Sequence, residues 1–187
     1  MSLPDDALRE IDLLVRGGFD EPHQIDTIVA EELYEPGQLD PVEVRAAVRA
    51  AASALRKSKA AWPAVTDCDK LDEVFDSLNR LGIVALQNAG YTQSDGYEDI
   101  RQAFHQHGNK ESVIGFCFYH RQDLNRVIES GDLYLAFGPI DPKREETDGP
   151  RIGAMIVDVL KAAGLSVEWN GAFGQRILVK NFDWKRR

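Results

Sequence analysis

The side chains best suited to chemistry lie close together in Gly115–Leu124, which reads Gly-Phe-Cys-Phe-Tyr-His-Arg-Gln-Asp-Leu. Cys117, His120 and Asp123 supply a thiol, an imidazole and a carboxylate, which are the groups of nucleophilic and acid–base catalysis. We expect a strand over residues 113–119, and side chains alternate between the two faces of a strand. Cys117 therefore faces away from His120, which favours a buried, inert thiol over a thiol–imidazole dyad.

His120 is expected where this strand gives way to a helix over residues 122–129. In one interpretation His120 caps the helix, and the carboxylate of Asp123, three residues later, returns a bond to it. In the other, His120 is a neutral imidazole at the positive end of the helix, suited to general-base or ligand-binding work. Under the second interpretation, His120 and Asp123 are candidate catalytic residues.

A second polar segment, residues 87–96, joins an expected strand at 83–87 to a helix that begins near residue 96. It lies at the carboxyl end of a strand, where open α/β sheets bind ligands. A capping box of Asp95 with Glu98 fits the same residues, and the glycine pattern of a phosphate-binding loop is absent. The segment supplies Tyr91 and Asp95 as further catalytic candidates, and Gln87 and Asn88 as ligand-binding candidates.

The remaining candidates carry less chemistry. Trp169 either lines a pocket, which makes it a ligand-binding candidate, or packs at the edge of a sheet. His105 and His107 point to opposite sides of a helix, so they do not bind one metal ion together. Cys68 and Cys117 lie far apart in the sequence, and no zinc-binding spacing is present. We therefore expect no metal site and no cofactor.

The first sixty residues are expected to be wholly helical. Apolar residues recur at helical spacing in three stretches, which end at Gly17–Gly18, at Glu35–Gly37 and near Ala60. The second stretch places Leu33 on the apolar face, and Asp40 caps the third helix. We expect a helical N-terminal segment over residues 1–61, packed on the main domain.

From residue 62 onwards the pattern changes to alternating helices and strands, after a helix over 66–82. A polar loop over 139–149 is expected to hold Glu145, Glu146 and Asp148 as solvent-facing charges. The expected strands cover 83–87, 113–119, 133–137, 165–169 and 176–179, and the last two form a hairpin. Residues 62–187 therefore predict an α+β (or α/β) sandwich domain, with a four- to five-stranded sheet packed with helices.

Charge and composition bound the function. The chain has 187 residues and a net charge of −9, and residues 1–43 hold twelve acids against Arg9 and Arg16. Such an acidic segment argues against nucleic-acid and anionic-membrane binding, which need a basic face. No signal peptide or membrane-spanning run is visible, so we expect a cytoplasmic protein. A protein partner or a homo-oligomer fits the charge asymmetry.

The sequence contains a set of short motifs: Leu39–Asp40, Trp62–Asp67, Gln87–Asn88, Gly115–Asp123, Tyr134–Gly138, Gly164–Trp169, Arg176–Ile177 and Asp183–Trp184. Together these motifs resemble a bacterial family of uncharacterised proteins that carries a domain-of-unknown-function label. Many relatives look as though they have a Cys-Cys-x-x-Cys-Gly turn after the first strand, but the matching positions here are Tyr91, Thr92 and Asp95. A thiolate metal site or redox turn therefore does not carry over, and His120 with Asp123 matches the family pattern best.

Two functional interpretations fit these residues. In the first, the chain is a non-enzymatic binding or adaptor protein that meets a protein partner through its acidic helical segment or its sheet. In the second, it is a small enzyme or small-molecule-binding domain, in which the 87–96 turn and the His120/Asp123 junction form one polar crevice. The second requires the strands before these two junctions to be parallel, because only then do both junctions lie at one edge of the sheet.

Overall fold

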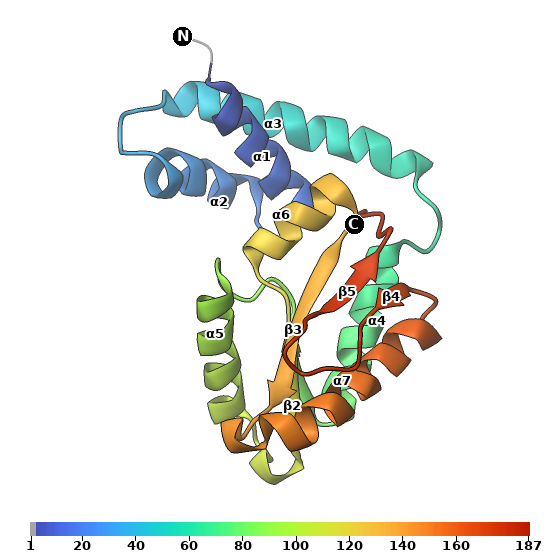
Figure 1. The fold of residues 1–187 in the computed structure, drawn as a ribbon. Coiled ribbons are helices and arrows are strands. Elements are labelled where there is room, and N and C mark those ends of the chain that lie inside the picture. Colours follow the sequence, from blue (N-terminus) through green and yellow to red (C-terminus); the bar gives the residue numbers. More distant parts are fainter. Residues whose placement is uncertain (1–2) are drawn as a thin grey trace. The chain divides into compact units, whose positions relative to one another are not determined.

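The computed structural model describes residues 3–187 and has the mixed α+β architecture expected from the sequence (Figure 1). In this described part, seven α-helices accompany one five-stranded sheet, and four of the helices precede the first strand. The chain divides into two compact units. One comprises the residues up to Thr66 together with Trp184–Arg187, and the other comprises Asp67–Asp183. An independent domain boundary between residues 61 and 62 stays a prediction.

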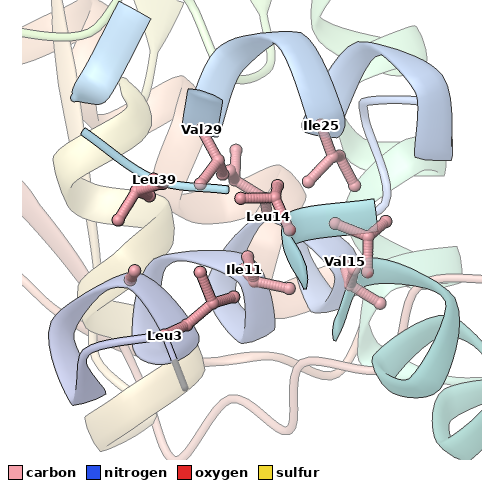
Figure 2. Close-up of a cluster of buried hydrophobic side chains, with 10 residues drawn as sticks. Leu3, Ile11, Leu14, Val15, Ile25, Val29 and Leu39 are labelled. Atoms are coloured by element: carbon pink, nitrogen blue, oxygen red, sulfur yellow. The ribbon is translucent and has the colours of Figure 1, made fainter. Parts of the chain in front are cut away.

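The first unit is a small helical bundle. Its apolar side chains gather between the helices, and Figure 2 shows Ile11, Leu14, Ile25 and Val29 in this cluster. Asp40 accepts a hydrogen bond of 2.8 Å from the backbone N–H of Val42, so it caps the third helix as predicted. The elements are α1 (Asp5–Gly17), α2 (Pro22–Thr27), a π-helix (Ile28–Leu33), α3 (Pro41–Ser58) and a 3₁₀ turn (Lys59–Ala61).

The prediction of a second helix is correct in position, but part of this helix is a π-helix and not an α-helix. After Thr27 the backbone continues as a π-helix, which shifts the periodicity of the side chains away from 3.6 residues per turn. Val29 stays buried, but Leu33 is 40% exposed instead of lying on the apolar face. An apolar stripe in the sequence does not reveal this change, because it assumes one helical period throughout.

The last four residues belong to the first unit. The indole N–H of Trp184 donates to the carbonyl of Arg16 at 3.1 Å, and the Trp184 side chain is buried. Its ring lies 6.4 Å from that of Phe19, and the guanidinium of Arg186 lies 4.4 Å from the Phe19 ring centroid. A segment that follows the whole sheet in sequence therefore completes the bundle.

The second unit is built on a mixed sheet with the strand order β1-β2-β3-β5-β4. β1 and β2 are parallel, and every other neighbouring pair is antiparallel, including the expected hairpin of β4 and β5. The strands are β1 (Ile83–Leu86), β2 (Gly115–Phe118), β3 (Leu133–Pro139), β4 (Ser166–Glu168) and β5 (Ile177–Lys180).

Helices cover both faces of this sheet (Figure 1). A Cβ atom on Gly96 of α5 would lie 2.2 Å from the ring of Phe118, so α5 packs directly on that face of β2. A Cβ atom on Gly115 would lie 2.9 Å from Ile152 of α7, which covers the opposite face. Alternation along β2 therefore holds as predicted. The helices are α4 (Asp67–Arg80), α5 (Gln93–Gln106), α6 (Arg121–Ser130) and α7 (Glu145–Ala162).

Two helices begin earlier than the sequence analysis expected. α5 begins at Gln93, because Thr92 and Asp95 form the capping box rather than Asp95 and Glu98. α7 begins at Glu145, so Glu145, Glu146 and Asp148 occupy its first turn instead of a loop. Acidic side chains suit this end of a helix, and Asp148 is further paired with Arg144 at 2.8 Å. Pro150 lies inside α7, where its missing N–H removes one backbone hydrogen bond of the helix.

Candidate functional site

The two polar junctions predicted from the sequence lie side by side. Because β1 and β2 are parallel, their carboxyl ends lie at the same edge of the sheet. The backbone N–H of Ala89 donates to the carbonyl of Tyr119 at 2.9 Å, and that of Arg121 donates to the carbonyl of Gly90 at 3.0 Å. Backbone hydrogen bonds thus join the 87–96 turn to the segment that contains His120.

Most polar groups of the 87–96 turn serve the fold. Gln87 accepts from the Tyr119 hydroxyl at 3.0 Å and donates to Asp72 at 2.7 Å. Asn88 adopts a left-handed backbone conformation (φ 51°) and lines, with Gln87, a cavity of about 390 Å³. Asp95 accepts from the backbone and hydroxyl of Thr92, and these hydrogen bonds lower the pKa of its carboxyl group. Tyr91 is 53% exposed.

His120 is the N-cap residue of α6, and Asp123 makes the return bond that the spacing predicted. The Asp123 carboxylate accepts from the His120 backbone N–H at 3.3 Å and lies 3.0 Å from Nε2 of its imidazole. The His120 side chain is only 6% exposed, and together with Asp123 it forms the capping box of α6. Nε2 is thus committed to Asp123, and the imidazole acts first as a structural group.

Asp123 is completely buried and holds the cluster together. Its carboxylate binds the guanidinium of Arg176 through both oxygens, with Nη1 at 3.1 Å from Oδ1, and Arg126 approaches the same oxygen at 3.4 Å. Burial alone would raise the pKa of Asp123, but the hydrogen bonds from His120 and Arg176 and the charge of Arg176 outweigh it. The pKa of Asp123 is therefore held below its usual range.

The two arginines were missed as functional candidates in the sequence analysis. Arg176 also donates to the carbonyl of Tyr134 at 2.8 Å. The guanidinium of Arg126 lies 5.2 Å, and that of Arg176 5.7 Å, from the centroid of the Tyr134 ring. The spacing of Asp123 and Arg126 on one helix face was a usable signal. Arg176 stood out only as part of a family motif, and its contact with Asp123 was not predictable because that contact depends on the pairing of β3 with β5.

A groove of about 660 Å³ opens beside these two side chains, and we call it the arginine groove. Its cationic end is formed by Arg126 and Arg176, whose side chains are 50% and 25% exposed. Trp169, a predicted ligand-binding residue, lies in its wall, whereas Gln87 and Asn88 line the other cavity. The side chains that define the groove are Arg126, Tyr134, Glu168, Trp169, Arg176 and Leu178.

The wall of the groove is fixed by the loop that joins β4 to β5. The indole N–H of Trp169 lies within hydrogen-bond distance of the carbonyls of Ala172 (3.1 Å) and Gln175 (3.0 Å), which closes the loop on itself. The Trp169 ring packs edge-on against Phe137 at 5.6 Å. It fits there because Gly153 of α7 has no side chain, and a Cβ atom at that position would lie 2.6 Å from the ring.

Cys117 does not belong to the site. Its thiol is buried, and burial raises its pKa to about 12. A thiol with such a pKa is protonated at neutral pH, so it is a poor nucleophile. Across residues 3–187, no three His, Cys, Asp or Glu side chains gather to hold a metal ion. No helix in that same range is long and apolar enough to cross a membrane.

The family described as "Domain of unknown function (DUF6891)" matches residues 2–187 of the sequence. The chain belongs to this family. The expected resemblance to a family with a domain-of-unknown-function label is thereby confirmed over nearly the whole chain. No curated protein and no solved structure matches the sequence.

Proposed function

We propose that this protein binds a small acidic molecule in the arginine groove and does not transform it chemically. The observation that carries the proposal is the placement of two guanidinium groups on one buried carboxylate, beside the ring of Tyr134 and facing a groove. Guanidinium groups bind carboxylates and phosphates through paired, charge-assisted hydrogen bonds.

The charges of the cluster leave room for an anion. Asp123 contributes one negative charge against the two positive charges of Arg126 and Arg176, so at least one positive charge is uncompensated whatever the state of His120. Glu168, also in the groove, is already paired with Lys180 at 2.8 Å. The negative charge of an acidic ligand would therefore neutralise the excess positive charge in the groove.

The two arginines are suited to different tasks. Arg176 is held by Asp123 and by the Tyr134 carbonyl, so it loses little conformational freedom when a ligand binds. Arg126 makes one long bond of 3.4 Å to Asp123 and is half exposed, which leaves most of its five N–H donors available. We therefore assign the direct contact with the ligand to Arg126 and the positioning to Arg176.

The same geometry favours binding over catalysis. A nucleophile at Cys117 is buried and protonated. His120 is buried with Nε2 on Asp123, and the lowered pKa of Asp123 makes its carboxyl group a poor proton donor. The adaptor interpretation, which rests on the acidic charge of residues 1–43, stays a prediction beside this proposal.

A thermal-shift screen of the full chain tests the proposal. The panel holds sodium salts of small carboxylic acids, inorganic phosphate and the neutral amides of the same acids. A ligand that binds only the folded state raises the unfolding midpoint. We expect at least one acid, and none of the amides, to stabilise the wild type, and Arg126→Ala to remove this response.

Arg101→Ala is the matched control. Arg101, like Arg126, lies on a helix, pairs with a carboxylate three residues earlier (Glu98) and is exposed to solvent. The Arg101–Glu98 pair is exposed and contributes about 1 kcal/mol or less. Asp123 is buried but keeps its bond to Arg176 when Arg126 is truncated, so both variants should fold. If Arg126→Ala and Arg101→Ala respond to every acid as the wild type does, the groove is not the binding site, and the adaptor interpretation gains weight.

A further inference from the structure

We infer that the ligand of the arginine groove is a monocarboxylate whose apolar body spans about two strand spacings. This inference rests on the proposed function and deepens it by naming the ligand class. Its basis is the order in which side chains lie along the floor of the groove, from one end to the other.

Three side chains form a row across three neighbouring strands. Tyr134 of β3 pairs in register with Leu178 of β5, and Leu178 pairs with Glu168 of β4. Residues paired in this way point to the same face of a sheet, and all three line the groove. Neighbouring strands lie about 4.8 Å apart, so the row extends roughly 10 Å from the Tyr134 end to the Glu168 end.

The charge of the side chains changes along the row. The first end is cationic, the middle is apolar, and at the far end a negative and a positive charge are paired. At the first end, Arg126 and Arg176 exceed Asp123 by one positive charge. Leu178, half-buried in the middle, offers no hydrogen bond from its side chain. At the far end, Glu168 is compensated by Lys180. One anionic group at the first end is therefore matched, and a second anionic group at the far end would meet the Glu168 carboxylate.

This pattern discriminates between acids of similar length. A neutral alcohol leaves the excess guanidinium charge unmatched. A dicarboxylate of the same length places its second charge beside Glu168, and a phosphate monoester carries more negative charge at neutral pH than the single positive excess. A monocarboxylate with an unbranched six-carbon chain matches both the charge and the length of the row.

Isothermal titration of the full chain with four probes tests the inference: hexanoate, hexan-1-ol, adipate and hexyl phosphate. We expect hexanoate to bind about tenfold or more tightly than each of the others, as a charge-assisted hydrogen bond allows. Arg126→Ala should weaken hexanoate binding by about tenfold, whereas Arg101→Ala should leave it unchanged. Leu178→Ser should weaken hexanoate but not acetate, which is too short to reach Leu178.

The results separate this inference from the proposed function. Equal or tighter binding of hexan-1-ol, adipate or hexyl phosphate overturns the monocarboxylate class. If hexanoate fails to bind while another acid still binds in a manner that depends on Arg126, the proposed function stands and the inference falls. If no acid binds in that manner, both fall.

Discussion

Asp123 and Arg176 lie far apart in the sequence, yet their side chains form the best-defined contact of the site. The partnership of His120 with Asp123 could be predicted, because both lie within one turn at a helix start and local spacing specifies the contact. The partnership with Arg176 could not, because it depends on which strand lies next to β3. Sequence spacing thus located the buried carboxylate but not the cations that give the site its charge.

Acid should weaken the protein partly through Asp123. Its pKa is lowered in the folded state, so its contribution to stability is complete above the unfolded-state pKa of about 4 and is lost as the pH falls through the folded-state value. Urea unfolding at a series of pH values should show wild-type stability falling more steeply below pH ~4 than that of Asp123→Asn. Parallel profiles for the two proteins would show that Asp123 is not responsible.

At the scale of elements, the order of helices and strands followed from apolar periodicity, and the parallel pairing of β1 with β2 brought the two predicted junctions together. The start of α7 and the π-helical winding after Thr27 did not follow. The sequence analysis assumed one helical period for the second helix and a polar loop over 139–149, and neither assumption reveals these features. Close approaches between elements are equally hidden in a sequence, and Gly153 is the clearest example.

Gly153→Ala should destabilise the protein although alanine favours a helix. The gain in helix propensity is about 1 kcal/mol. Against it, the new methyl group would lie 2.6 Å from the Trp169 ring and 2.8 Å from the Phe137 ring, and overpacking of this kind costs about 1–3 kcal/mol. We expect a net loss of about 1 kcal/mol in urea denaturation, together with weaker ligand binding because the wall of the groove moves.

Gly174→Ala provides the control for the measurement of stability. Gly174 lies in the same β4–β5 loop, its φ is not positive, and a Cβ atom there would meet nothing within 4 Å. The stability of the Gly174→Ala variant should equal that of the wild type or be slightly higher, because alanine restricts the conformations of the unfolded chain. Equal stability of Gly153→Ala and the wild type would mean that α7 shifts freely, which contradicts a fixed groove wall.

At the scale of the whole molecule, the helical bundle contains a segment that follows all five strands in the sequence. Trp184 is buried, and its indole N–H satisfies the carbonyl of Arg16 near the end of α1. No periodic pattern in residues 1–61 indicates this need, since the bundle already has an apolar cluster of its own. The assignment of 184–187 to the first unit therefore came only from the structure.

Trp184→Ala should lower stability strongly, by about 3–5 kcal/mol, as large aromatic truncations in a core do. Trp184→Phe keeps an aromatic ring but loses the hydrogen bond to Arg16. It should therefore lower the free energy of unfolding by about 1 kcal/mol. Urea denaturation followed by far-UV circular dichroism measures both. If Trp184→Ala unfolds at the wild-type midpoint, the bundle is complete without its last segment.

The return of Trp184–Arg187 to the bundle makes the second unit an insertion within the first. During synthesis, the ribosome completes Asp67–Asp183 before it adds the residues that finish the bundle. Most of the bundle is therefore synthesised first, but the bundle is completed only after the second unit has been synthesised. Slow synthesis of Asp67–Asp183 would therefore also delay the completion of the bundle.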